Sequence, residues 1–166
     1  MVLFKRKIFY ILVVVFTSIS CYSQSKTING ILIKVPEGFV YQEENKTVDI
    51  WLKNEENIAF LLQYYESSKS DYENRKAIKL DSETTEYIDF GTFEILKKKY
   101  DIQINMNYDT QSLVAQTLVY RDGYMYIIIY AVGVDLEKGL DKKYATDTVE
   151  RLFIETIYFI KMILTS

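Results

Sequence analysis

Apolar and polar positions alternate along most of the chain beyond residue 27, which is the pattern of β-strands. The strictest alternation is YDIQINMN at residues 100–107. It predicts a strand with one face in water, placed toward an edge of a sheet. In a second strand, over residues 46–53, the apolar side chains of Val48, Ile50 and Leu52 share one face, and the other face carries Asp49, Trp51 and Lys53.

Two further segments are apolar on both faces. Residues 57–66 (NIAFLLQYYE) favour a strand inside a sheet that is covered on both sides. Leu113 to Tyr120 and Tyr124 to Val132 flank the dipeptide Asp122-Gly123, which suits the positive φ angles of a two-residue hairpin turn. This hairpin would pair Val119 with Tyr126, Thr117 with Ile128, Ala115 with Tyr130 and Leu118 with Ile127.

The remaining elements are predicted from shorter signals. Residues 28–35 form a β-branched strand that ends at the turn Val35-Pro36-Glu37-Gly38, and short strands resume over 87–97. Ser70 and Glu73 have the spacing of a capping box, which predicts a helix over 71–80. A second helix is expected over 142–154. Residues 155–161 then return as a strand, or the helix continues to Leu164.

The N-terminus has the three zones of a secretory signal, which we assign to residues 1–23. Cations at Lys5, Arg6 and Lys7 precede the apolar run IFYILVVVF, and small polar residues follow. The apolar run is too short for a spanning helix, so we favour export over an uncleaved anchor. Cleavage after Ser23 would release residues 24–166 as one domain. The alternative is a lipoprotein anchored through a lipidated Cys21.

Charge and cysteine content narrow the classes of partner. Removing the three early cations from 20 Lys and Arg against 23 Asp and Glu leaves a mildly acidic mature domain. Nucleic-acid binding is disfavoured, because it needs a basic face and Lys97, Lys98 and Lys99 are the longest basic run. Without Cys21 the mature domain has no thiol, so burial alone must stabilise it outside the cell. Membrane attachment is expected only through Cys21.

The chain lacks the usual residues of catalysis. It has no histidine, which removes histidine-activated nucleophiles and the common zinc ligand sets, and it has no phosphate-binding loop. Carboxylates at Glu43-Glu44, Glu55-Glu56 and Asp135 to Asp141 adjoin predicted turns, where solvated charge is the ordinary explanation. We therefore expect no catalytic residue, no metal site and no cofactor.

Aromatic side chains are the better candidates for a binding site. Trp51 shares a strand face with Asp49 and Lys53, and Tyr124, Tyr126 and Tyr130 line one side of the predicted hairpin. Exposed rings of this size are typical of partner sites. The alternative, which we favour, is that a helix covers this face and makes the rings core residues with hydroxyls at the rim.

Three segments together resemble the PsbP-like family, which is named for an extrinsic subunit of photosystem II. They are GILIKVPEGF at 30–39, Asp122-Gly123-Tyr124, and LFIETIYF at 152–159. The fold is shared by a Ran-GTPase release factor and many bacterial exported proteins. The resemblance implies an α+β fold in which a mainly antiparallel sheet is sandwiched between helices, and it implies a non-enzymatic accessory or binding role.

These observations favour an exported binding or accessory protein of the bacterial envelope, periplasmic or extracellular, that acts on an unknown protein or small-molecule partner. One alternative is a lipid-anchored structural envelope protein without a ligand. Another is a secreted hydrolase that uses two close carboxylates, and only the acidic clusters support this alternative.

Overall fold

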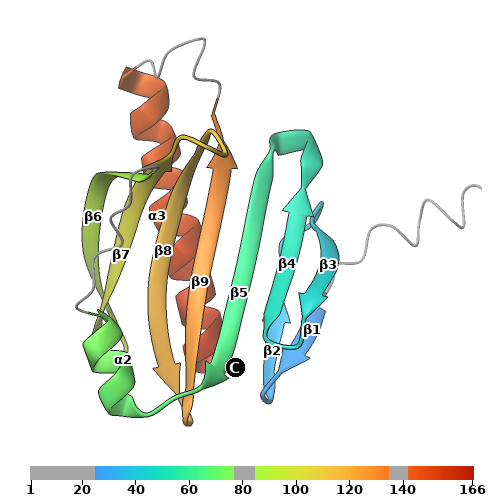
Figure 1. The fold of residues 1–166 in the computed structure, drawn as a ribbon, viewed down its shortest axis with the longest axis vertical. Helices are drawn as coiled ribbons and strands as arrows, with labels where there is room; N and C mark the ends of the chain where they lie inside the picture. The colour runs from blue at the N-terminus through green and yellow to red at the C-terminus, as the bar shows by residue number, and fades with distance from the viewer. Residues whose placement is uncertain (1–24, 77–84, 135–141) are drawn as a thin grey trace, which may run out of the picture.

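A computed structural model describes residues 25–76, 85–134 and 142–166 of the chain. Its centre is a seven-stranded antiparallel sheet with the order β3-β4-β5-β9-β8-β7-β6, beside a two-stranded sheet of β1 and β2 (Figure 1). The fold class is therefore α+β, as predicted. The strands are β1 Ser25–Ile28, β2 Ile31–Lys34, β3 Val40–Asn45, β4 Val48–Lys53, β5 Ile58–Glu66, β6 Thr85–Ile95, β7 Lys98–Asn107, β8 Ser112–Arg121 and β9 Tyr124–Gly133. The helices are the short 3-10 helix η1 Asn54–Glu56, α2 Lys69–Lys76 and α3 Lys142–Thr165.

The β8–β9 hairpin forms as predicted. Its turn residues Asp122 and Gly123 have φ angles of 51° and 83°. Val119 pairs with Tyr126 and Leu118 with Ile127, so the predicted register is confirmed along the hairpin. β7 is the penultimate strand of the sheet, which confirms its expected place toward an edge.

The N-terminal strand predicted over 28–35 is in fact the second half of a hairpin. β1 and β2 pair antiparallel around Asn29 and Gly30, whose φ angles are 48° and 80°. The dipeptide Asn-Gly favours a tight hairpin turn because both residues accept positive φ, so it divides the apolar run. β2 ends at Lys34, just before the predicted turn, where Gly38 has a φ of 91°.

One face of the large sheet is covered by α3 together with the β1–β2 hairpin. Phe159 of α3 stacks on Phe60 of β5 with 3.7 Å between ring centroids, and Phe153 contacts Phe93 of β6. We call this side the sealed face. Of the two alternatives for residues 155–164, the helix is correct, because Phe159, Ile160 and Ile163 continue the buried stripe.

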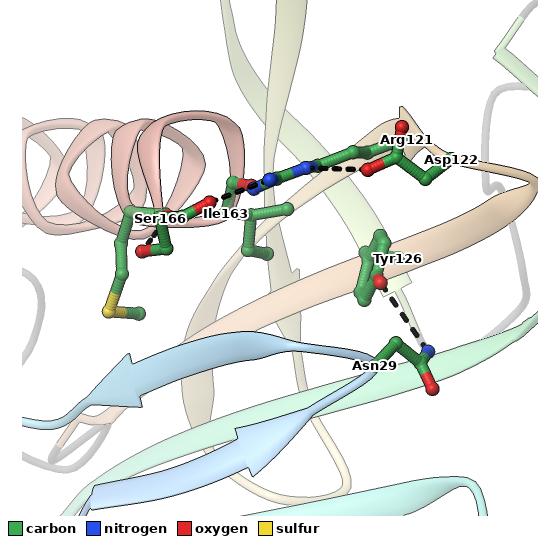
Figure 2. Close-up of polar contacts among 7 residues, drawn as sticks. Asn29, Arg121, Asp122, Tyr126, Ile163 and Ser166 are labelled. Carbon is green, nitrogen blue, oxygen red and sulfur yellow. Dashed lines mark hydrogen bonds and ion pairs between the residues drawn. The ribbon is translucent and has the colours of Figure 1, made fainter.

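The C-terminal end of α3 is held by a side chain from the sheet (Figure 2). Arg121, the last residue of β8, donates hydrogen bonds to the carbonyl oxygens of Ile163 and, at 2.6 Å, of Ser166. A cation at this end of a helix satisfies carbonyls that lack intrahelical donors and complements the helix dipole. Among the described helices, none is both long and apolar enough to span a bilayer.

The short helix α2 covers one end of the opposite face. Its first turn is capped by Ser68, whose hydroxyl accepts a hydrogen bond from the backbone N–H of Asp71 at 3.0 Å and donates one to the Asp71 carboxylate at 2.6 Å. The cap therefore lies two residues before the predicted Ser70. Both serines have an acidic residue three positions later, and the helix forms at the earlier one. The predicted helix end, beyond Lys76, lies outside the described residues.

Burial of tyrosines in the sealed face predicts a loss of stability at high pH. Burial raises the pKa of Tyr130 to about 12, whereas an unfolded tyrosine loses its proton near a pKa of about 10. Above pH 10 the unfolded state thus binds fewer protons than the folded state, and the free energy of unfolding falls as pH rises toward 12. In urea unfolding across this range, Tyr130→Phe should show a shallower fall than the wild type. Tyr158→Phe, on the exposed side of α3, should follow the wild type, and equal slopes for all three would contradict this account.

Candidate functional site

Three of the four aromatic candidates lie in the core of the sealed face. Trp51, Tyr126 and Tyr130 are 0%, 1% and 2% exposed, and only Tyr124 keeps part of its surface in solvent. Trp51 stacks on Phe60 at 5.1 Å, and the Tyr126 hydroxyl accepts a hydrogen bond from the Asn29 amide at 3.4 Å (Figure 2). This placement agrees with the alternative in which a helix covers this face and the rings are core residues. A binding role for these rings stays a prediction, with Tyr124 the accessible member. Cys21 lies outside the described residues.

The opposite side of the sheet, which we call the open face, carries a broad apolar surface. Among the described residues, only α2 packs on this side, at one end (Figure 1). Met125 of β9 points there and is fully buried, but the other apolar side chains of β4, β5, β8 and β9 on this side are partly exposed. They are Val48, Ile50, Leu52, Ala59, Leu61, Val114, Leu118, Ile129 and Ala131, with Ile127 at 9% exposure.

Strand register joins these side chains into rows that cross the sheet. Gln116 pairs with Ile129, Ile129 with Leu61, and Leu61 with Ile50. Neighbouring strands lie about 4.8 Å apart, so the row from β8 to β4 extends about 14 Å. Leu118 and Ile127 form the start of the next row. The apolar members of these rows form a strip that runs from Leu118 on β8 through Ile127 and Ile129 on β9 to Leu61 on β5 and Ile50 on β4, with Gln116 and Gln63 at its borders.

A cavity of about 340 Å³ opens beside α2, where the strip meets polar side chains. That volume is within the usual range of small-molecule sites. The cavity is lined by Leu118, Ile127, Asp101, Gln103, Gln116 and Thr117 from the sheet and by Arg75 and Lys76 from α2. The sequence pattern predicts no role for either cation. The signal was present in the adjacent Arg75-Lys76 pair, which closes a polar helix.

The two cations at the cavity are held by uncharged groups. Arg75 donates a hydrogen bond to the Tyr65 hydroxyl at 2.5 Å and lies over the Tyr65 ring, 5.3 Å from its centroid. Lys76 donates to the carbonyl oxygen of Lys99 at 3.3 Å. Within the described ranges, neither cation forms an ion pair with a carboxylate. The Asp101 carboxylate accepts a hydrogen bond from the Thr92 hydroxyl at 2.9 Å.

A second polar cluster ties the β1–β2 hairpin to the sealed face. Asp49 is fully buried, and its Oδ1 accepts hydrogen bonds from Lys26 Nζ and from the Tyr41 hydroxyl, each at 2.5 Å. Burial alone would lower the pKa of Lys26, but hydrogen bonds to Asp49 and Tyr41 and the charge of Asp49 outweigh it and raise the pKa. A carboxylate neutralised by a lysine in this way serves as a structural tie.

The acidic clusters are positioned as solvated charge where the structure describes them. Glu55 and Glu56 are exposed, and Glu56 forms ion pairs with Lys53 and, at 2.8 Å, with Arg151. These pairs lower the pKa of Glu56. The side chains of Glu43 and Glu44 and the segment Asp135 to Asp141 lie outside the described part. The described residues contain no group of three or more potential metal ligands.

Comparison with solved structures identifies the fold. The solution structure of cyanobacterial PsbP (CyanoP) from Synechocystis sp. PCC 6803 matches 82% of this chain and 89% of its own, with a TM-score of 0.51 and 12% sequence identity. The chain has the PsbP-like fold. The crystal structure of the Ran-binding protein Mog1p from Saccharomyces cerevisiae matches 88% of this chain and 100% of its own, with a TM-score of 0.49 and 12% identity.

The family resemblance predicted from sequence is thus confirmed at the level of the PsbP-like fold. No family model and no curated protein matches the sequence itself. Identity of 12% shows a shared architecture and carries no residue roles. The function must therefore be argued from the surface of this chain.

Proposed function

We propose that this protein is an exported, non-enzymatic binding or accessory module of the bacterial envelope, and that the open face is its contact surface. The observation that carries the proposal is the apolar strip from Leu118 to Ile50, which the described helices leave partly exposed. Contiguous apolar patches on soluble domains mark interaction sites, because exposing them to water is unfavourable. The signal-like N-terminus and the absence of histidine from the sequence support the same assignment.

Face-specific capture from envelope extract tests this proposal. Leu61 lies near the middle of the strip and is partly exposed, so Leu61→Lys should disrupt contact without emptying the core. Ile154, 60% exposed on the outer side of α3, provides the matched control Ile154→Lys. We expect wild type and Ile154→Lys to retain the same envelope component, and Leu61→Lys to lose most of it while its circular dichroism and melting temperature stay near those of the wild type.

Two outcomes would contradict the proposal. Equal retention by all three proteins would exclude the open face as the contact surface. Hydrolase activity in the purified protein, together with no retained component, would favour the carboxylate hydrolase instead.

The lipid-anchored alternative concerns attachment and is tested separately. Mass spectrometry of the mature N-terminus distinguishes a free Gln24 from an acylated Cys21. A mature protein that begins at Gln24 would support export without an anchor. An acylated Cys21 would show instead that the protein is anchored to the membrane.

A further inference from the structure

We infer that the cavity beside α2 binds the carboxylate of an unbranched amphipathic anion, whose hydrocarbon chain lies along the open face. This inference rests on the proposed use of the open face for binding and adds the chemical class of the ligand. It is carried by the position, at the end of an apolar strip, of two cations that form no ion pair with any carboxylate of the described residues.

The charge at the cavity favours an anion. Arg75 and Lys76 contribute two positive charges and Asp101 one negative charge to its lining. The Arg75 guanidinium uses one donor on Tyr65, and the Lys76 ammonium donates to one carbonyl, which leaves further donors on both groups. A guanidinium suits a carboxylate in particular, because its donors match the two carboxylate oxygens.

Neutral donors lie beside the cations. Gln103 and Gln116 face each other across the β7–β8 ladder, and both side chains line the cavity. Amide N–H groups can complete the hydrogen bonds of a carboxylate that leaves water. The cavity thus offers both charge and neutral donors to a single headgroup.

The apolar strip determines the shape of the rest of the ligand. Leu118 and Ile127 line the cavity itself, and Ile129, Leu61 and Ile50 continue the apolar surface across β9, β5 and β4. This strip is about 14 Å long, a length that fits an extended acyl chain. Each methylene that moves from water onto this strip adds to the binding affinity.

Titration calorimetry with dodecanoate, below the concentration at which it forms micelles, tests the inference on the purified full mature protein. Dodecyltrimethylammonium has the same chain and the opposite charge, and dodecyl maltoside has a neutral headgroup. We expect dodecanoate to bind at least about tenfold more tightly than either of the others, since a charge-assisted hydrogen bond contributes more than a neutral one.

Variants distinguish binding at the headgroup site from non-specific binding of amphiphiles. The double substitution Arg75→Gln with Lys76→Gln should weaken dodecanoate binding by about tenfold or more and leave the neutral detergent unaffected. Lys97→Gln with Lys98→Gln, two exposed lysines at the β6–β7 turn, removes the same charge elsewhere and should bind as the wild type does.

Equal binding of the cationic and anionic probes, unchanged affinity after loss of Arg75 and Lys76, or no dodecanoate binding would each overturn the inference. If dodecanoate fails to bind but envelope capture still depends on Leu61, the ligand class is wrong and the proposed function stands. The partner would then be a protein. If both fail, the proposed function falls as well.

Discussion

Replacing Lys26 by methionine is expected to lower the free energy of unfolding by about 3 kcal/mol, because it leaves a buried carboxylate without its cation. Asp49 is 0% exposed and cannot turn toward water. The Lys26 side chain is 33% exposed, so the opposite change is milder. In Asp49→Leu, the lysine can extend its ammonium group into solvent.

A double-mutant cycle measured by urea unfolding tests this asymmetry. The order of stability should be wild type above Asp49→Leu, with Lys26→Met lowest of the single variants, and the combination of both changes should recover much of the loss. Because the Lys26 pKa is raised, the contribution of the pair is present through neutral pH and is lost only as pH rises through that raised value. Equal effects of the two single changes would contradict a buried carboxylate.

Replacing Phe159 by alanine is expected to destabilise the domain by about 3 to 5 kcal/mol. The ring is fully buried, stacks on Phe60 at 3.7 Å and contacts Tyr130 at 6.2 Å. Its removal opens a cavity between α3 and the centre of the sheet. Since natural domains are stable by only about 5 to 15 kcal/mol, the loss should be evident as a large drop in the urea midpoint.

The control for this prediction lies on the same helix. Ile154 is 60% exposed, so Ile154→Ala should change the free energy of unfolding by no more than about 0.5 kcal/mol. A small effect of Phe159→Ala, comparable to that of Ile154→Ala, would mean that α3 does not seal the sheet.

The parts of the fold that the sequence predicted correctly are those governed by local rules. The Asp122-Gly123 turn fixes the register of the central hairpin because only a few residues accept its backbone angles. By the same rule, Asn29-Gly30 could have revealed the β1–β2 hairpin, since it carries the same signal. The apolar run around it predicts a single strand instead.

Which face of a strand is buried could not be predicted from local pattern. In β4, the face with Asp49 and Trp51 is sealed, and the more uniformly apolar face with Ile50 and Leu52 stays partly exposed. The outcome depends on Lys26, 23 positions earlier, which neutralises Asp49. Such a long-range pairing leaves no periodic signal in the sequence.

The open face is partly exposed because the described helices cover only part of the sheet. The sequence predicts a sheet sandwiched between helices, and helices do lie on both faces, but they differ in size: α3 is long and amphipathic, and the described part of α2 is short and polar. α3 covers the sealed face, and α2 reaches only the end of the other. The candidate site is thus the apolar part of the sheet that the described helices leave uncovered.

Carbene footprinting, with and without envelope extract, tests most directly whether the open face is exposed and serves as the contact surface. Leu61 and Leu62 are neighbours on β5, as are Ile128 and Ile129 on β9, and each pair has one side chain on each face of the sheet. We expect Leu61 and Ile129 to be labelled in the free protein and protected by the extract, while Leu62 and Ile128 stay unlabelled in both samples. Two results would contradict the open face as the contact surface. Leu61 and Ile129 could remain unlabelled in the free protein, or the extract could leave their labelling unchanged.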